Sequence, residues 1–596
     1  MGTYFRIAHQ HYHLLVIEEQ MDDSINSHFQ LPRMGWGENA GVADQLEHIA
    51  QLLLIMDENT FKIRAYQRGA EAVRQSLQPI SQMRREDLLE IRGVGKGIAE
   101  AIISIIETGT CNELESLMEK IPPDLPELLE IDGIGPKTVQ KLWRHLNITS
   151  IQELEDAARS RRIRSVRGLG AKKEEEILRA VTVHKNRSGR MLLSDAEAIG
   201  EEIIGVLPPG RYSFAGSLRR GRSTIGDIDI VTTNPAVSVN PGLRDIASEM
   251  IDEGTKKTSF FFKGKRIDIR FADPAEYGAT LLYLTGSKEF NIRLRERAIA
   301  RGLRLNEYGL LDQKTKELIR YPDEEMIFRQ LGLSFIPPEL REDRGEVARA
   351  ESDTLPSLVE QKDIRGDLHA HSTGSDGTMT ISEMAELGDR LSYEYILCSD
   401  HSASLGVARG LSEDGLKRQA HQIEIANRDH TCRILRGIEV DILADGRLGL
   451  PDAVLADLDC VIASIHSVLH QETDTITRRM ITAMENEHVD IIGHPTGRLI
   501  GRREPSAIDM PRILAAAKET GTALELNASP YRLDLDDIYL KNAIELGVMI
   551  AIGTDAHRPG EYAHMRYGVT TARRGWCRTD TILNTKTLSQ LMDFFR

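Results

Sequence analysis

Apolar residues in the first third of the chain recur three or four positions apart, which is the spacing of amphipathic helices. One such run covers 42–56 and a second covers 65–77. Three turns of related sequence follow, each between two helical stretches: 91–97, 131–137 and 166–172. We therefore predict a helical region with repeated helix–hairpin–helix units that extends to residue 190, after a loose polar tail at 1–38.

The apolar spacing changes to alternation after residue 190, and alternation is the spacing of β-strands. Four alternating runs are separated by glycine-rich turns: 212–216, 227–232, 258–262 and 266–271. A mixed α+β unit is therefore predicted over 191–340. The charged stretch that follows, 341–362, contains Pro356 and is predicted to be a linker.

From residue 363 onward, strand-like and helix-like runs take turns. Seven strand-like runs can be distinguished: 364–369, 395–400, 434–440, 459–465, 489–493, 522–527 and 548–554. Seven β-α units in a row predict a distorted (β/α)7 barrel, related to the eight-unit barrel. Active sites in such barrels lie at the carboxyl ends of the strands, so function is expected from polar residues there.

Composition narrows this picture. A chain of 596 residues is too long for one hydrophobic core, so several domains are expected. No stretch approaches the roughly 18 apolar residues that span a bilayer, and the first 33 residues lack the apolar core of a secretory signal. The five cysteines form no Cys-x-x-Cys pair, which predicts a reducing compartment and a cytoplasmic location.

The net charge of −16 hides three short basic stretches: 159–173, 219–222 and 256–266. Such stretches either contact nucleic-acid phosphates or are solvated surfaces, and the pattern alone fits both interpretations. Carboxylates that hold metal ions would account for part of the negative charge.

One candidate centre contains Asp227 and Asp229 in a predicted strand. Side chains alternate between the faces of a strand, so these two carboxylates point the same way and repel unless a cation lies between them. Asp268 offers a third carboxylate from a neighbouring strand. Three aspartates suit two Mg²⁺ ions that activate a 3′-hydroxyl and neutralise a leaving pyrophosphate. The turn Gly216–Arg220 offers amides, a hydroxyl and cations for triphosphate oxygens.

A second candidate centre consists of nine residues at the ends of the later strands. They are His369, His371, Asp376, His401, Glu439, His466, His494, Asp555 and His557. Six imidazoles and three carboxylates suit two or three Mn²⁺ or Zn²⁺ ions, and such multinuclear sites are typical of phosphate-ester hydrolysis. Arg409 and Arg436, near two strand ends, are candidates to hold the substrate phosphate.

The upstream motifs resemble those of family X DNA polymerases over about residues 40–340. The resemblance rests on these segments: 61–66, 216–220, 226–229, Asp268 and 283–291. It implies that Asp227, Asp229 and Asp268 bind the catalytic Mg²⁺ ions. It also implies that eight residues bind the nucleotide: Arg190, Gly216, Ser217, Arg220, Gly226, Tyr283, Gly286 and Asn291.

The same resemblance gives the hairpins a function. Glycines at a helix N-terminus expose amides to phosphate, and such contacts hold DNA without reading its sequence. The residues expected to contact DNA are Lys62, Gly93, Gly95, Lys96, Gly133, Gly135 and Lys137. Ala101 stands where the family's lyase activity uses a lysine, and Leu284 replaces an aromatic residue found in many relatives. The resemblance therefore does not by itself carry lyase chemistry to this chain.

The downstream residues resemble the PHP (polymerase and histidinol phosphatase) domain, whose nine metal positions are all filled here. Together the two resemblances divide the chain into seven segments. These are a tail (1–38), a helical helix–hairpin–helix domain (39–120), helical fingers with helix–hairpin–helix repeats (121–190), a nucleotidyltransferase palm (191–272), a thumb (273–340), a linker (341–362) and the PHP domain (363–596).

The leading hypothesis is a DNA-directed DNA polymerase that fills short gaps in repair, whose PHP centre trims 3′ ends as a 3′-5′ exonuclease. Its expected partners are gapped or primed duplex DNA and dNTPs, without a membrane, and a monomer is expected. Two alternatives stay open: a PHP centre that is a phosphatase for small phosphomonoesters, and a non-enzymatic scaffold that binds gapped DNA. Non-templated nucleotide transfer is less favoured, because the hairpins suit duplex DNA.

Overall fold

The computed structural model describes residues 39–595, except 57, 75–79, 81–82, 92, 109, 119, 123–124, 132, 189, 405–409 and 470. The predicted tail at 1–38 and the candidate Arg409 lie outside the described residues. The chain forms two compact units that divide after Leu178. Within the described part of the chain, no helix is long and apolar enough to cross a membrane.

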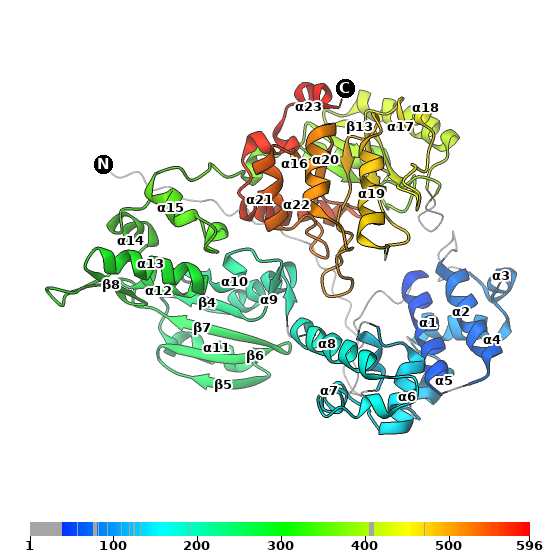
Figure 1. The fold of residues 1–596 in the computed structure, drawn as a ribbon, viewed down its shortest axis with the longest axis horizontal. Coiled ribbons are helices and arrows are strands. Elements are labelled where there is room, and N and C mark those ends of the chain that lie inside the picture. Colours follow the sequence, from blue (N-terminus) through cyan, green and yellow to red (C-terminus); the bar gives the residue numbers. More distant parts are fainter. Residues whose placement is uncertain are drawn as a thin grey trace. The chain divides into compact units, whose positions relative to one another are not determined.

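The first unit is built from helices, as the apolar spacing predicts (Figure 1, blue to cyan). They are α1 (Asn39–Met56), α2 (Thr60–Arg74), α3 (Arg85–Glu90), α4 (Lys96–Thr108), α5 (Asn112–Met118), α6 (Pro136–Leu146), α7 (Ile151–Arg159) and α8 (Ala171–Ser188). Leu46, Ile49 and Leu53 of α1 are fully buried. Helix α1 packs against α2 and contacts α6, so it forms the centre of this core.

The three hairpins of this unit share one backbone feature. The first glycine of each has a positive φ: 109° at Gly93, 77° at Gly133 and 85° at Gly168. Only glycine adopts such angles readily, which explains its presence in all three turns. The second glycine precedes α4, α6 or α8, and a Cβ there would meet no atom within 4 Å: Gly95, Gly135 and Gly170. The helix N-termini are thus open to a close ligand.

Residues 191–272 form a five-stranded sheet, here called the palm sheet, in the order β2-β4-β7-β6-β5. Its strands are β2 (Tyr212–Phe214), β4 (Ile228–Thr232), β5 (Glu249–Glu253), β6 (Lys257–Phe262) and β7 (Lys265–Phe271). Strands β4 and β7 are parallel, and the other pairs are antiparallel. The edge strand β5 was not predicted, because its sequence Glu-Met-Ile-Asp-Glu lacks apolar alternation.

Further elements surround the palm sheet. They are β1 (Met191–Leu192), α9 (Leu193–Gly205), α10 (Gly216–Arg219), β3 (Thr224–Ile225) and α11 (Ala236–Ile246). The next part contains α12 (Tyr277–Thr285), α13 (Lys288–Ala300), β8 (Leu303–Asn306), β9 (Gly309–Asp312), β10 (Leu318–Ile319) and α14 (Glu324–Gln330). Its small antiparallel sheet has the order β10-β9-β8.

The predicted linker 341–362 is packed against the rest of the second unit. It contains α15 (Glu346–Glu351), and Arg341 and Val359 are fully buried. Arg341 Nη1 donates to Glu324 Oε1 at 2.6 Å. Two of the charges that suggest a linker, those of Arg341 and Glu342, therefore belong to buried ion pairs whose partners lie elsewhere in the chain.

The predicted (β/α)7 barrel is confirmed (Figure 1, green to red). Its parallel strands follow chain order: β11 (Gly366–Ala370), β12 (Tyr395–Cys398), β13 (Arg433–Asp441), β14 (Cys460–Ser464), β15 (Ile491–Ile492), β16 (Ala523–Asn527) and β17 (Ile550–Gly553). A bridge between Ala370 and Ala556 joins the end of the last strand to the first. The helices are α16 (Ile381–Leu391), α17 (Glu413–Asp429), α18 (Asp452–Leu455), α19 (Thr473–Met484), α20 (Met510–Thr520), α21 (Asp537–Leu546), α22 (Met565–Arg574) and α23 (Leu588–Phe594).

Within the second unit, the barrel and the palm share hydrophobic packing. Leu533 and Tyr567 of the barrel are buried in the same cluster as Leu218 and Ile228 of the palm. The Tyr567 hydroxyl also donates to Glu197 Oε2 at 2.9 Å. The two parts that carry the candidate centres are therefore packed together.

Two candidate metal centres

The structure brings the three predicted aspartates together on the palm sheet. Asp229 on β4 and Asp268 on β7 are register partners in the parallel pair, and Asp227 precedes β4. One carboxylate oxygen from each of the three lies within 4.8 Å of the others. Adjacent strands thus place three negative groups at one end of the sheet, which suits a pair of divalent cations.

The crowding of these carboxylates is visible in the pKa of Asp229. Burial, together with the charges of Asp227 and Asp268, raises the pKa of Asp229 to about 7. Lys257 Nζ lies 2.8 Å from Asp268 Oδ2 and offsets part of the repulsion. A cation bound among the three carboxylates would favour the ionised form of Asp229 and lower its pKa.

Removing this repulsion should stabilise the metal-free protein. Between pH 3.8 and about 7 the folded state holds a proton on Asp229 that the unfolded state has released. The contribution of Asp229 to the free energy of unfolding therefore falls as pH rises through that window. Its full destabilising effect is present above pH 7. We expect Asp229→Asn to raise the free energy of unfolding at pH 8 by on the order of 2 kcal/mol, with a smaller gain at pH 5.

Thermal unfolding in EDTA at the two pH values measures this difference. An equal gain at both would show that packing, and not charge, explains the change. A loss of stability at pH 8 would contradict the repulsion itself.

The predicted triphosphate turn lies against the aspartates. Gly216 has a φ of 58°, and a Cβ there would lie 2.4 Å from Asp229 Oδ2, so glycine is required. Ser217 follows in α10 and is half-buried. Arg220 is buried; its Nε donates to Glu342 Oε1 at 3.0 Å and its Nη1 to the Thr285 carbonyl at 2.5 Å.

The other predicted nucleotide residues have contacts of their own, and one of them, Gly286, lies beside Arg220 of this turn. Arg190 Nε donates to Thr224 Oγ1 at 2.9 Å, and a Cβ on Gly226 would lie 3.2 Å from Arg190 Nη1. Gly286 has a φ of 69°, and a Cβ there would lie 3.1 Å from Arg220 Nη1. Asn291 Nδ2 donates to the Tyr283 carbonyl at 2.7 Å. Of the predicted nucleotide residues, Gly216 therefore contacts the aspartates directly, while Gly226 lies beside Arg190 and Gly286 beside Arg220.

The nine downstream residues converge at the carboxyl ends of the barrel strands and are here called the cage. In each of three overlapping groups the ligand atoms lie within 4.8 Å of one another: His371, Asp376, His401 and His557; His369, His371 and Asp555; His401, Glu439 and His466. His494 Nε2 lies 3.0 Å from Glu439 Oε1 and completes the set. Two histidines belong to two groups each, as expected for neighbouring ions.

Buried atoms without partners show that the cage fits metal ions. Four ligand atoms are buried and lack a hydrogen-bond partner among the described residues: His371 Nδ1, His401 Nδ1, Glu439 Oε2 and His494 Nδ1. Glu439 Oε2 is 2.9 Å from His401 Nδ1, but the two are not aligned for a hydrogen bond. Each such orphan costs about 1–3 kcal/mol, so a cluster of them favours a bound cation. Imidazole-rich ligation suits Mn, Zn or Fe better than Mg.

The electrostatics of the cage centre on Glu439. Although burial acts in the opposite direction, its carboxylate raises the pKa of His466 to about 10. Burial and the nearby Arg532 instead lower the pKa of His494 to about 4. Two ligands also have unusual backbone angles, with φ of 26° at His494 and 56° at Asp555. Such angles cost on the order of 1–3 kcal/mol and tend to cluster at functional sites.

Two carboxylates that orient cage histidines were not predicted. Glu525 Oε1 lies 2.7 Å from His369 Nδ1, and Asp441 Oδ1 lies 2.8 Å from His466 Nδ1. Each fixes an imidazole so that its other nitrogen faces the cage. Their signal is present in the sequence, because Glu525 interrupts an apolar strand and Asp441 follows Glu439 at the two-residue spacing of one strand face.

An arginine beside the cage was also missed. Arg532 Nε lies 3.6 Å from Asp555 Oδ2, and its Nη1 is buried without a hydrogen-bond partner among the described residues. Arg436, predicted to hold phosphate, instead lies on the opposite face of β13 from Glu439 and pairs with Asp459 at 2.9 Å. Nothing in the spacing of the sequence distinguishes Arg532 from Arg436, because a loop and not a strand places it.

The predicted DNA contacts of the first unit lie at its hairpins. Gly93, Gly95, Lys96, Gly133, Gly135 and Lys137 are all exposed. A cavity of about 570 Å³ beside the first hairpin is lined by Lys62, whose Nζ pairs with Glu113 at 2.7 Å. Ala101 is buried, so this position faces the core of the helical unit.

Models of known families match three parts of the chain. Residues 280–342 match the DNA polymerase beta thumb, and residues 37–111 match a helix-hairpin-helix domain. Residues 125–181 match a SAM-like helix-hairpin-helix tandem. These matches cover the parts in which the structure has the hairpins and the segment after the palm sheet.

Similar proteins extend the comparison to nearly the whole chain. The DNA polymerase/3′-5′ exonuclease PolX of Bacillus subtilis (strain 168) is 39% identical over 562 residues, which are 92% of this chain and 98% of that protein. A probable phosphatase of Thermoanaerobacter sp. (strain X514) is 33% identical over 231 residues, 37% of this chain and 89% of that protein. DNA polymerase lambda of Rattus norvegicus is 24% identical over 337 residues, 51% of this chain and 56% of that protein.

Proposed function

Because this chain belongs to the PolX family of family X DNA polymerases, we propose that it fills short gaps in DNA and removes nucleotides from 3′ ends at a second centre. The observation that carries the proposal is the presence of two ligand clusters with different chemistry. One cluster is made of carboxylates alone on the palm sheet, and the other is rich in imidazole at the barrel mouth.

We assign nucleotide addition to the palm. Mg²⁺ held by Asp227, Asp229 and Asp268 would activate the primer 3′-hydroxyl and neutralise the leaving pyrophosphate. The turn that begins at Gly216 would hold triphosphate oxygens with its amides and the Ser217 hydroxyl, beside Arg190, Arg220 and Gly226. Tyr283, Gly286 and Asn291 would line the nucleotide pocket. Together these residues would hold the incoming nucleotide beside the aspartates.

We assign 3′-5′ exonuclease activity to the cage. Two or three Mn²⁺ or Zn²⁺ ions held by the nine ligands would supply a nucleophile from water and polarise the phosphodiester. Glu525 and Asp441 hold two of the imidazoles in the required tautomer and orientation. Arg532 would offer a phosphate oxygen its Nη1, which has no hydrogen-bond partner in the described part of the chain.

The hairpins of the first unit would grip the DNA on both sides of a gap. Their exposed amides and Lys62, Lys96 and Lys137 suit backbone phosphates. The partners are therefore gapped or primed duplex DNA and dNTPs, and we propose a monomer. The five cysteines are buried and free of disulfides, which supports a cytoplasmic location.

A labelled primer on a gapped duplex tests both activities at once. With Mg²⁺ and dNTPs the primer should grow by the length of the gap, and growth should follow the template. With Mn²⁺ and no dNTPs the same primer should shorten from its 3′ end. A primer that binds but never changes length would support the scaffold alternative.

The phosphatase relative supports a second candidate for the barrel. That protein is named a probable phosphatase and its match covers 37% of this chain, about the extent of the barrel. A barrel with this function would release phosphate from a small phosphomonoester. Comparing p-nitrophenyl phosphate with a single-stranded oligonucleotide separates the two, since an exonuclease should prefer the oligonucleotide by orders of magnitude.

A buried ion network ties the triphosphate turn to the barrel. Arg574 of α22 is 4% exposed, and its Nη1 donates to the Arg220 carbonyl at 2.6 Å and to Glu342 Oε1 at 3.0 Å. Its Nη2 donates to Asp537 Oδ2 at 2.7 Å. Glu342 also accepts from Arg220, so Arg574 is a positioning residue for the proposed triphosphate ligand.

Loss of Arg574 should weaken nucleotide binding from a distance. In Arg574→Ala, Glu342 would pair with Arg220 alone. We therefore expect KM for dNTP to rise about tenfold while kcat changes less. Steady-state gap filling measures both constants. Arg578→Ala is the matched control, because Arg578 is exposed and pairs only with the nearby Asp580 among the described residues. An unchanged KM for Arg574→Ala would contradict the positioning role.

A further inference from the structure

Two loops of the barrel hold each other between the cage and the palm. After β16, Arg532 N and Leu533 N both donate to the Ser529 carbonyl, at 2.8 and 2.9 Å, which places Tyr531 at the tip of a tight turn. The second loop starts at the cage residue His494 and forms a small hairpin in which Leu499 pairs with Arg503. Ile500 N donates to the Tyr531 carbonyl at 2.6 Å. The tip of the turn is therefore hydrogen-bonded to the second loop.

The side chain of Tyr531 is left exposed although it is large and aromatic. It is 45% exposed, and Arg502 Cζ lies 5.4 Å from the centre of its ring. An exposed ring beside a guanidinium is the combination on which proteins stack unpaired nucleic-acid bases. Stacking needs no particular base, which suits an enzyme that removes any nucleotide.

The next residue along the chain points the other way, toward the cage. The Arg532 side chain is 18% exposed, and its Nε lies 3.6 Å from Asp555 Oδ2. Its Nη1 is buried and has no hydrogen-bond partner among the residues that the structure describes. Arg498 Nε donates to the Arg532 carbonyl at 2.7 Å and so holds the backbone in place. Tyr531 thus offers an exposed platform for a base, and the adjacent Arg532 offers a phosphate ligand at the cage.

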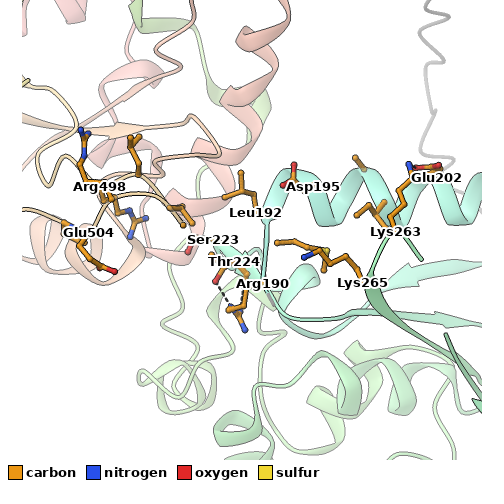
Figure 2. Close-up of a pocket in the computed structure, with 18 residues that line it drawn as sticks. Arg190, Leu192, Asp195, Glu202, Ser223, Thr224, Lys263, Lys265, Arg498 and Glu504 are labelled. Atoms are coloured by element: carbon orange, nitrogen blue, oxygen red, sulfur yellow. Dashed lines mark hydrogen bonds and ion pairs between the residues drawn. The ribbon is translucent and has the colours of Figure 1, made fainter. Parts of the chain in front are cut away.

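The second loop, to which the Tyr531 turn is hydrogen-bonded, faces the palm across a cavity of about 730 Å³ that its residues 498–501 and 503–505 line. Figure 2 shows Arg498 and Glu504 on the barrel side and Leu192, Asp195 and Lys265 on the palm side. Cations line it on both sides, including Arg190 and Lys265 of the palm and Arg503 of the barrel. A polyanionic strand without its complement could therefore occupy the space between the two parts.

We propose that Tyr531, Arg502 and Arg532 form a subsite for the unpaired 3′-terminal nucleotide of a DNA strand. The base stacks on Tyr531 beside Arg502, and the phosphodiester to be cut lies on Arg532 at the cage. The inference rests on the proposed exonuclease function and assigns to it the residues that would bind the terminal base and the phosphodiester to be cut. It follows that paired 3′ ends, whose terminal base is already stacked in the duplex, are poor substrates.

Binding without catalysis tests the platform. The probe is a single-stranded oligothymidylate with 2-aminopurine at its 3′ end, added to the full-length protein in EDTA. The wild type should quench the 2-aminopurine fluorescence through stacking. Tyr531→Ala should lose the quenching and bind about tenfold more weakly, whereas Tyr531→Phe should keep both. Tyr308→Ala removes another ring that lies beside a cation, Lys256 at 4.9 Å, and should bind as the wild type does.

Catalysis on two substrates separates the platform from the cage. Bis(p-nitrophenyl) phosphate is a diester without a base, so Tyr531→Ala should cleave it at the wild-type rate yet degrade the oligonucleotide about tenfold more slowly. Arg532→Ala should slow both substrates by about ten- to a hundredfold, because it contacts the phosphate.

Three outcomes would overturn the subsite. In the first, Tyr531→Ala quenches 2-aminopurine fluorescence and degrades the oligonucleotide as the wild type does. In the second, Tyr531→Ala loses cleavage of both substrates to the same extent. The third is a wild type that cleaves no oligonucleotide at all, which would remove the exonuclease function on which the subsite depends. Only this third outcome also contradicts the proposed function, so the two failures are distinguishable.

Discussion

Asp227→Ala is expected to reduce nucleotide addition by at least about a thousandfold and to leave 3′-5′ degradation within about twofold of the wild type. Asp227 is one of three carboxylates whose oxygens lie within 4.8 Å of one another, so its loss opens the ligand set on one side. The side chain is exposed, and its removal creates no cavity in the palm. The defect should therefore be chemical and not a consequence of unfolding.

Single-turnover primer extension and primer degradation measure the two rates on one gapped substrate. Asp227→Asn is the isosteric companion and should show the same selective loss, because an amide is a poor ligand for Mg²⁺. Asp245→Ala is a matched surface control of the same charge outside the cluster and should leave both rates unchanged. If Asp227→Ala lost both activities together, the separation of the two centres would be wrong.

His371→Ala should have the reverse effect. His371 belongs to two of the three ligand groups, so one substitution disrupts the positions of two ions. We expect degradation of 3′ ends to fall by at least about a hundredfold while gap filling persists. Degradation of a single-stranded oligonucleotide in Mn²⁺, measured beside gap filling in Mg²⁺, gives both rates.

A second variant tests whether the loss of activity reflects the cage and not a loss of barrel structure. Glu439→Gln keeps the size of a buried side chain that lies 3.0 Å from His494 Nε2 and 3.2 Å from His466 Nε2. It should lose exonuclease activity to a similar extent and keep the cooperative unfolding of the wild type. Full exonuclease activity in either variant would remove the cage from the mechanism.

The barrel and its cage could be predicted because strand order and site chemistry point to the same place. Six of the seven strand runs end at or beside one of the nine cage residues, and the carboxyl ends of parallel strands meet at one mouth. Gly553, the last residue of the last strand, also lies beside the cage. A Cβ on it would lie 2.4 Å from Glu525 Oε1. Glu525 does not follow this rule, because it lies within β16, which supplies none of the nine ligands, and orients His369 instead.

Segments held by distant ion pairs could not be predicted. Arg341 and Glu342 look like linker residues in the sequence, yet one is fully buried and the other lies between Arg220 and Arg574. Their partners are separated from them by 17 to 232 positions. Local composition shows that a segment is charged and therefore costly to bury. It does not show the distant partner that offsets this cost. The position of the Arg532 side chain could not be predicted for a similar reason, because a loop and not a strand places it.

Anomalous diffraction from crystals soaked in Mn²⁺ tests the central claim most directly, because it locates bound ions without reference to activity. Two separate sets of peaks are predicted: one among Asp227, Asp229 and Asp268, and one of two or three ions among the nine cage residues. Peaks at only one of these places, or imidazoles of the cage that bind no ion while Mn²⁺ lies elsewhere, would contradict the account.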